Sequence, residues 1–191
     1  MANTLATFSV CDGLRQFLQR AYETTVVKPV QGLAFEVMSA EQINAQRTAR
    51  DVLSVFLYRI TVNEHQRNTL LPHQKERAPL SLDLHLMLTS WCAQPRAEHA
   101  LLTWTMRELY QRPVLDLSVL STEAGWVQGD AIQLIPAELS NEDLMRVWDA
   151  LTPPYHLSLT YTARLVRIDA DPLPSFPPVV ATRFDVEEIR R

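Results

Sequence analysis

The chain has 191 residues, two cysteines and a formal net charge of −4. A chain of this length fits one domain that buries about 70% of the surface its unfolded form would expose, so it needs no disulfide or metal to fold. The acidic balance argues against a general nucleic-acid binder, because such a protein draws its affinity from a basic surface.

The first predicted element is an amphipathic helix between Thr4 and Tyr22. Apolar side chains recur there at intervals of three and four residues, which places them on one helical stripe: Leu5, Phe8, Cys11, Leu14, Phe17, Leu18 and Tyr22. Glycine inside a helix costs about 1 kcal/mol relative to alanine, so Gly13 would mark a close packing contact.

Two strands are predicted next. Leu33, Phe35 and Val37 alternate after a glycine and predict a short strand, and the polar residues 39–51 predict a loop or a short helical turn. The segment Val52–Val62 is β-branched and aromatic at both odd and even positions, which is typical of a strand covered on both faces. We therefore expect a central strand, covered on both faces for most of its length.

A leucine-rich segment at residues 80–90 has the clearest pattern in the chain. Leucine occupies every even position from 80 to 88, while the odd positions are mostly polar. This alternation predicts a half-buried strand whose leucine face packs under the helices at 4–22 and 95–112. The polar residues 63–78 would join it to the preceding strand as an overlong loop.

A second amphipathic helix is predicted between Pro95 and Arg112. Proline suits the first turn of a helix, and Pro113 would stop it. Its apolar stripe consists of Leu101, Leu102, Met106, Leu109 and Tyr110. Gly125 and Gly129 then bracket a turn before the strand-like residues 131–135.

A capping-box pattern that begins at Ser140 predicts the start of a short helix. Leu144, Val147, Trp148 and Leu151 would form the buried side of this short helix. Residues 155–168 predict a long strand whose apolar parity changes near Ala163, which indicates either a bulge or a strand buried on both faces at its far end.

The C-terminal residues 170–191 have a different composition. Prolines at 172, 174, 177 and 178 exclude a central strand, and the run Val179–Phe184 that follows has β-propensity. We expect residues 1–169 to form a single α+β domain and residues 170–191 a Pro-rich linker with an extended arm. The domain would hold a mixed, mostly antiparallel sheet of about four to five strands, packed by two or three amphipathic helices.

Few side chains form a pattern that could carry chemistry. His65 and His73 lie in the polar loop, but their spacing matches no standard zinc site, and His85 and His99 are expected at the surface. Cys92 and His99 could be drawn as a nucleophile and a base, without any recognised motif around them. No Gly-rich phosphate loop is present. We assign no catalytic, cofactor-binding or metal-binding residue.

The expected environment follows from the same sequence. No segment approaches the roughly 18 to 20 apolar residues that span a bilayer, and Met1-Ala2-Asn3-Thr4 lacks the basic start of a secretion signal. We therefore expect a soluble protein made in the cytoplasm, with no membrane partner. Cys11 and Cys92 are expected as reduced thiols, with a single disulfide as the alternative.

An ordered series of segments resembles a known family. The best-matched segments are Val55–Arg59, Pro79–His85, Glu98-His99, Pro136–Leu151 and Tyr155–Leu159. Together they resemble the N-terminal-domain family of tail terminator, or cap, proteins from extracellular contractile injection systems of the antifeeding-prophage type. No single motif is diagnostic, and the likeness rests on the order of the series between about Leu5 and Asp169.

The resemblance implies a structural role. It implies a non-enzymatic protein that assembles with itself as a ring, a hexamer in this family, and contacts the sheath and inner tube at the distal end of the particle. The particle would assemble in the cytoplasm and be released from the cell. The alternative is a cytosolic hydrolase or metal-dependent enzyme that uses Cys92 and His99, or the loop histidines.

Overall fold

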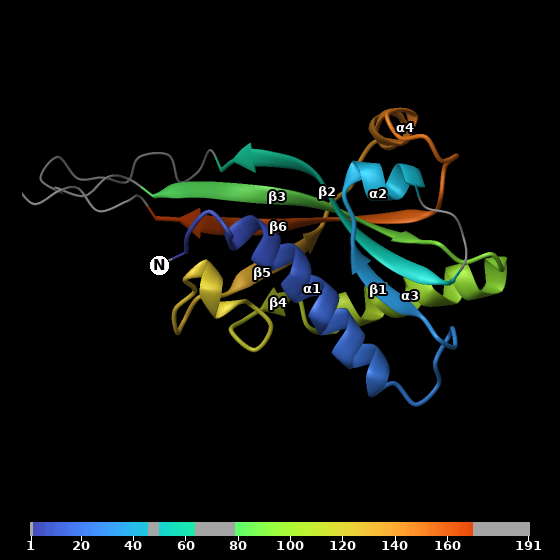
Figure 1. Ribbon diagram of the computed structural model, residues 1–191, viewed down its shortest axis with the longest axis horizontal. Helices are drawn as coiled ribbons and strands as arrows, with labels where there is room; N and C mark the ends of the chain where they lie inside the picture. The colour runs from blue at the N-terminus through green and yellow to red at the C-terminus, as the bar shows by residue number, and fades with distance from the viewer. Residues whose placement is uncertain (1, 46–49, 64–78, 170–191) are drawn as a thin grey trace, which may run out of the picture.

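The computed structural model describes residues 2–45, 50–63 and 79–169, which form a six-stranded sheet with helices on both faces (Figure 1). The helices are α1 (Ala6–Glu23), α2 (Ala40–Ala45), α3 (Pro95–Gln111) and α4 (Asn141–Asp149), with a short 3-10 turn at Thr122–Ala124. The strands are β1 (Ala34–Val37), β2 (Val52–Val62), β3 (Leu80–Ser90), β4 (Val114–Leu115), β5 (Ile132–Pro136) and β6 (Ser158–Ile168). The predicted α+β class is confirmed.

The strand order in the sheet is β1-β2-β3-β6-β5-β4. β1 pairs with β2 in parallel, and the four other pairs are antiparallel. The sheet is therefore mixed and mostly antiparallel, as predicted. Its sixth strand, β4, was not expected, because two residues are too few to produce an alternating pattern.

One face of the sheet carries the main core beneath α1 and α3. Leu82, Leu84, Leu86 and Leu88 of β3 are buried there with residues of both helices, including Leu14 and Leu101. This confirms the predicted packing of the leucine face. Leu80 is the exception, because it lies at the end of the strand and is 47% exposed.

The opposite face is covered by α2 and α4 (Figure 1). A second core cluster there joins Met87 and Trp91 to Ile43 of α2 and Trp148 of α4. The prediction of a half-buried leucine strand is therefore wrong at its C-terminal end, where β3 is buried on both faces. Met87 and Trp91, which occupy odd-numbered positions, contribute the apolar side chains of this second core cluster.

β2 is covered on both faces over only the first half of its length. Val52, Leu53, Ser54 and Val55 are buried, whereas side chains from Arg59 onward are mostly exposed. The pairing with β3 shifts between Leu57 and Arg59. The expectation that β2 would be covered for most of its length is wrong, because the strand extends beyond the helices that form the core.

β6 contains the predicted bulge. Leu82 pairs with Val166 and Leu84 with Ala163, so β6 has one more residue than β3 between these pairs. Leu165 lies inside this irregularity and has a φ of 62°, the left-handed region. The change of apolar parity seen in the sequence near Ala163 therefore comes from one inserted residue.

Gly13 occupies the close contact that its position in α1 predicted. A Cβ atom added at Gly13 would lie 3.1 Å from the carbonyl oxygen of Val119 and 3.3 Å from Leu120. This is tighter than most Cβ contacts. Glycine therefore lets α1 approach the segment that follows β4.

The two long helices bury a narrower stripe than the sequence indicated. Leu5 and Phe8 of α1 are exposed, and so are Met106 and Tyr110 of α3. Cys11, Leu14, Leu18 and Tyr22 of the predicted stripe in α1 are buried, and Val10 and Ala21 are buried with them. The predicted linker and arm at 170–191, and most of the polar loop, lie outside the described residues.

Candidate functional site

Cys92 and His99 do not form a catalytic pair in the structure. Cys92 follows the end of β3 and is half-buried, whereas His99 is exposed on α3. Burial raises the pKa of the Cys92 thiol, with Asp51 and Glu98 acting in the same direction. A protonated thiol is a poor nucleophile, so this environment works against the chemistry that a hydrolase would need.

Two of the three histidines in the described part of the chain, His85 and His156, contact neighbouring side chains. His85 Nε2 lies 2.9 Å from Thr61 Oγ1, and His85 Nδ1 lies 3.4 Å from Thr162 Oγ1. The His156 ring lies against Trp91, with 4.5 Å between ring centroids, and near Trp148. Among residues 2–45, 50–63 and 79–169 no group of three or more His, Cys, Asp or Glu side chains could hold a metal ion. His65 and His73 lie outside these ranges.

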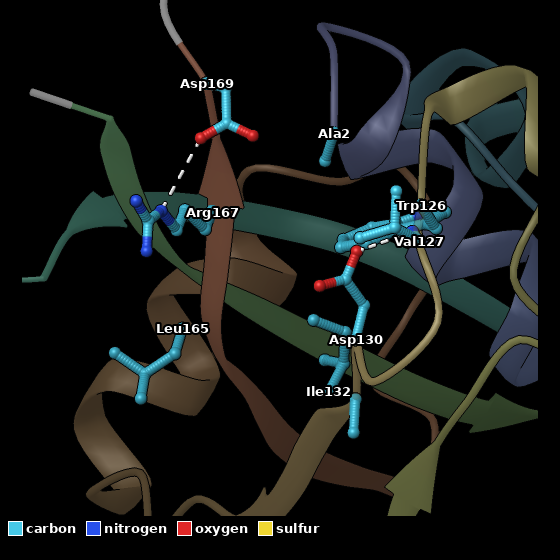
Figure 2. A pocket seen from close by; sticks show the side chains of 9 residues that line it. Ala2, Trp126, Val127, Asp130, Ile132, Leu165, Arg167 and Asp169 are labelled. Carbon is cyan, nitrogen blue, oxygen red and sulfur yellow. Dashed lines mark hydrogen bonds and ion pairs between the residues drawn. The ribbon is translucent and has the colours of Figure 1, made fainter. Parts of the chain in front are cut away.

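A shallow hollow of about 260 Å³ lies beside the end of β6 (Figure 2). Its lining comes from the N-terminus, the 126–132 segment and β6, and includes Trp126, Asp130, Leu165, Arg167 and Asp169. Asp130 accepts a hydrogen bond from the backbone N–H of Val127, and Arg167 pairs with Asp169 at 3.6 Å. Its polar groups therefore already have partners, and its volume is below the roughly 300 to 1,000 Å³ typical of small-molecule sites.

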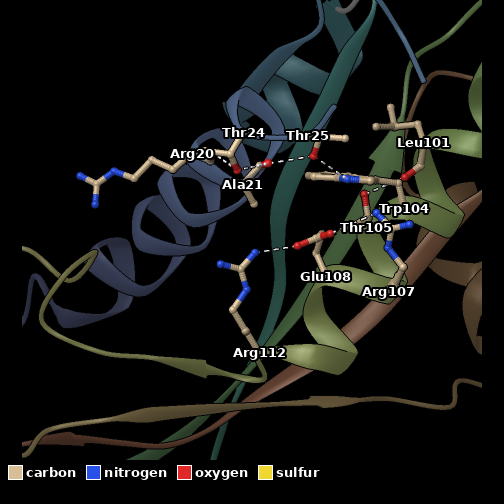
Figure 3. Close-up of polar contacts among 10 residues, drawn as sticks. All are labelled: Arg20, Ala21, Thr24, Thr25, Leu101, Trp104, Thr105, Arg107, Glu108 and Arg112. Carbon is tan, nitrogen blue, oxygen red and sulfur yellow. Dashed lines mark hydrogen bonds and ion pairs between the residues drawn. The ribbon is translucent and has the colours of Figure 1, made fainter. Parts of the chain in front are cut away.

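Polar contacts join α1 to α3 along their shared edge (Figure 3). The Trp104 indole N–H donates to Thr25 Oγ1 at 3.1 Å, and the Thr25 hydroxyl donates to the Ala21 carbonyl at 2.9 Å. Glu108 is nearly buried and pairs with Arg112 at 2.6 Å. The Trp104–Thr25 hydrogen bond joins the two helices, whereas the Glu108–Arg112 pair lies at the end of α3. These groups satisfy one another, so none of them is directed at a ligand.

Apolar side chains at the surface are more numerous than the sequence indicated. Val26 and Val27 protrude from the segment after α1, and Tyr110 on α3 is 86% exposed. Three further exposed apolar residues lie where β2 ends and β3 begins: Ile60 and Val62 of β2, and Leu80 of β3. Exposed apolar clusters of this kind are typical of surfaces that contact other proteins.

Sequence analysis did not find these surface residues as a group. It assigned Phe8, Met106 and Tyr110 to buried stripes, and it treated Ile60 and Val62 as part of a covered strand. Their exposure depends on where the neighbouring helices end. One feature of the sequence could have indicated the exposure of Ile60 and Val62. The long polar segment at 63–78 separates the two strands, and strand ends next to such a segment commonly lie away from the core.

Comparison with protein families gives the assignment. The family described as the Pvc16 N-terminal domain matches residues 9–182, which is most of the chain. This chain belongs to the Pvc16 N-terminal domain family. The resemblance drawn from the ordered sequence segments is therefore confirmed. A search of the curated proteins found no match.

Two solved structures share the fold. One is a sheath and tube terminator of an extracellular contractile injection system, PVC, in its extended state, with 21% identity and a TM-score of 0.60 over 96% of this chain and 64% of that chain. The other is the tube-terminating cap of the anti-feeding prophage, with 18% identity and a TM-score of 0.58 over 93% of this chain and 60% of that chain. This chain therefore spans less than two thirds of the length of each.

The described part of the chain contains no helix that is long and apolar enough to cross a membrane. The polar groups described above have partners, and the hollow is small. The exposed apolar side chains are therefore the feature of this Pvc16-type domain that points to a function. Contacts between proteins are the activity that this arrangement supports best.

Proposed function

We propose that this protein is a structural component of the cap that terminates the inner tube and the contractile sheath of a phage-tail-like injection system. The observation that carries the proposal is membership of the Pvc16 N-terminal domain family over residues 9–182. Two structures of the same fold come from a sheath and tube terminator and a tube-terminating cap.

The proposed partners are further copies of this chain and the last layers of sheath and tube. A cap on a rotationally symmetric tube is best matched by a ring of the same symmetry, and a hexamer is the proposed form. The exposed apolar residues on α1, α3 and the end of the sheet support such contacts. We propose assembly in the cytoplasm, followed by release with the particle.

A non-enzymatic role is the proposed consequence. Cys92 carries a raised pKa and His99 is exposed on α3, so the Cys92–His99 pair of the enzyme alternative lacks an activating arrangement. Variants Cys92→Ser and His99→Ala should therefore support particle assembly as the parent does. Loss of function in either variant, with normal protein yield, would favour the enzyme alternative.

Deletion of the gene tests the terminating role. Without a cap nothing arrests tube and sheath growth at a set point, so the particles should have irregular lengths or disassemble during purification. Negative-stain electron microscopy gives the length distribution directly. Complementation with the full chain is the control and should restore one narrow length class. Normal lengths and normal yield after deletion would contradict the proposal.

A further inference from the structure

One side of β2 is left without a neighbouring strand over half of its length. β1 pairs with β2 only from Val52 to Val55, whereas β3 pairs with β2 from Leu53 to Val62. Among the described residues no strand lies along the outer side of β2 after β1 ends. We refer to the stretch Leu57–Val62 as the open edge.

The backbone groups that face outward at the open edge belong to Ile60 and Val62. The Asn63 N–H donates to the Ser81 carbonyl of β3 at 2.9 Å. Along an antiparallel strand, the backbone groups of successive residues point alternately toward the paired strand and away from it. Thr61 therefore also directs its N–H and C=O groups toward β3, whereas Ile60 and Val62 direct theirs away from β3. A partner strand would find two donors and two acceptors there.

The side chains of Ile60 and Val62 are apolar and exposed, as is common for residues that contact another protein. Ile60 is 48% exposed and lies opposite Leu84 of β3, and Val62 is 44% exposed and lies opposite Leu82. Arg59 is the one charged residue of the open edge, and the β-branched residues Ile60, Thr61 and Val62 follow it. Such an edge promotes unwanted pairing unless another segment covers it. The comparable stretch of β6 is already contacted, because the Asp169 N–H donates to the Ala2 carbonyl at 3.0 Å.

The C-terminal arm starts at the same end of the sheet. β2 and β6 are both antiparallel to β3, so both run toward the end where residue 170 begins. Residues 170–178 contain four prolines, and Val179–Phe184 follows with the highest β-propensity of the arm. An extended Pro-rich linker of nine residues reaches about 28 Å at 3.1 Å per residue.

The direction of β6 favours a partner copy. To reach the open edge of its own domain, the arm would have to reverse after Asp169 and cross the end of β3, where residues 64–78 also emerge. A proline-rich linker resists such a reversal because it is stiff and extended. The same linker carries the arm outward without strain if the acceptor belongs to a neighbouring copy.

We propose that residues 179–184 of one copy add as a strand to the open edge of β2 in the next copy. The arm would exchange main-chain hydrogen bonds with Ile60 and Val62 and cover their side chains. Donor and acceptor lie on different parts of the same chain, so repeated donation is head-to-tail, a contact that forms a ring when the rotation between copies closes. The inference rests on the self-association proposed above and specifies its contact.

Disulfide trapping between differently tagged copies tests this contact. One copy carries Ile60→Cys and the other Thr182→Cys, both in a Cys92→Ser background, and the two purified full-length proteins are mixed and oxidised. Cys11 remains in place because it is buried and its pKa is raised to about 12, which keeps it unreactive. Non-reducing gels should show a mixed dimer of both tags.

Val26→Cys paired with Thr182→Cys is the matched control. Val26 is 97% exposed and lies in the segment that leads into β1, whose first residue Ala34 pairs with Val52 at the start of β2, at the other end of the strand from the open edge. Its mixed dimer should therefore be at least tenfold less abundant. Equal trapping at both positions would overturn the proposal. An intrachain disulfide in a single chain carrying Ile60→Cys and Thr182→Cys, without mixed dimers, would show that the arm pairs with its own domain and would also overturn it.

A proline at the open edge separates loss of pairing from loss of folding. Val62→Pro removes an outward N–H that β3 does not use, and proline is tolerated at such positions of edge strands. The variant should melt near the parent temperature and lose the trapped dimer at the Ile60 position, whereas Val62→Thr should keep it. Trapping that persists in Val62→Pro would contradict the proposed hydrogen bonds.

Native mass spectrometry of the full chain and of a chain ending at Asp169 distinguishes the two proposals. A ring from the full chain and monomers from the shortened chain support both. Rings from both chains would overturn arm donation and leave the cap function standing. A full chain that stays monomeric and gives no mixed dimers would overturn arm donation, and the gene-deletion assay would then decide the capping role by itself.

Discussion

Leu84 is part of the main core, has no exposed surface, and lies between Ile60 and Ala163 on the neighbouring strands. Leu84→Asp would place a carboxylate there without a partner. Burial of an unpaired ionisable group costs several kcal/mol, comparable to the whole stability of a domain of this size. We expect the variant to be unfolded or to lose several kcal/mol in urea denaturation.

Leu80→Asp is the matched control for this prediction. Leu80 belongs to the same leucine series but is 47% exposed at the end of β3. A carboxylate at this position remains hydrated, so the free energy of unfolding should change by less than about 1 kcal/mol. Equal losses in the two variants would contradict the burial assigned to the strand.

His85 and His156 make stability depend on pH between neutral and mildly acidic conditions. Burial lowers the pKa of both rings from the ordinary 6.5, and Arg59 lowers that of His85 further, against the opposing charge of Asp83. Below pH 6.5 the unfolded chain therefore binds more protons than the folded chain. Stability contributed by the neutral rings is present above this pH and is lost as the pH falls through the folded-state values.

We expect the urea midpoint to fall as the pH is lowered from 7.5 to 5. His85→Gln should reduce this dependence because glutamine keeps a polar partner for Thr61 without titrating. The exposed His99 provides the control, since His99→Gln should leave the pH dependence as it is in the parent. A parent protein whose midpoint is constant over this range would contradict the assignment.

At the scale of elements, α4 depends on its first turn and on one tryptophan. The Ser140 hydroxyl accepts a hydrogen bond from the Asp143 N–H at 3.0 Å, as the capping-box pattern predicted. Trp148 is the only buried residue within the helix and packs edge-on against Trp91, with 6.2 Å between centroids. A helix of nine residues with so little buried surface needs its cap to stay folded.

Ser140→Ala should lower the free energy of unfolding by about 1 kcal/mol, because the N–H of Asp143 loses its acceptor. Urea denaturation followed by tryptophan fluorescence measures this loss, since Trp91 and Trp148 lie in the affected cluster. Ser140→Asp keeps an acceptor at the cap and should remain close to the parent. A loss of similar size in Ser140→Asp would show that the cap is not the cause.

At the scale of the whole molecule, the two faces of the sheet carry hydrophobic cores of different size. α1 and α3 cover the larger core, whereas α2 and α4 cover a smaller one built around Trp91 and Trp148. The long strands β2, β3 and β6 extend past these helices at one end (Figure 1). That end combines the open edge of β2, the start of the arm and exposed apolar side chains, so it is the region where we expect neighbouring copies to meet.

The sequence by itself determined the elements whose signals are local. The leucine alternation of β3, the capping box at Ser140, the proline at the start of α3 and the parity change near Ala163 each depend on residues close together in the chain. Such signals operate through backbone geometry and one neighbouring layer. The family likeness rested on their order along the chain.

Tertiary structure alone decided which apolar residues remain exposed. Phe8 and Tyr110 lie on helices with the expected periodicity, yet the faces that α1 and α3 bury consist of other positions, so these two side chains are exposed. Ile60 and Val62 have the composition of a covered strand, but β1 ends after four paired residues and leaves them at an edge. Burial depends on where distant elements begin and end, and no short-range pattern along the chain records that distance.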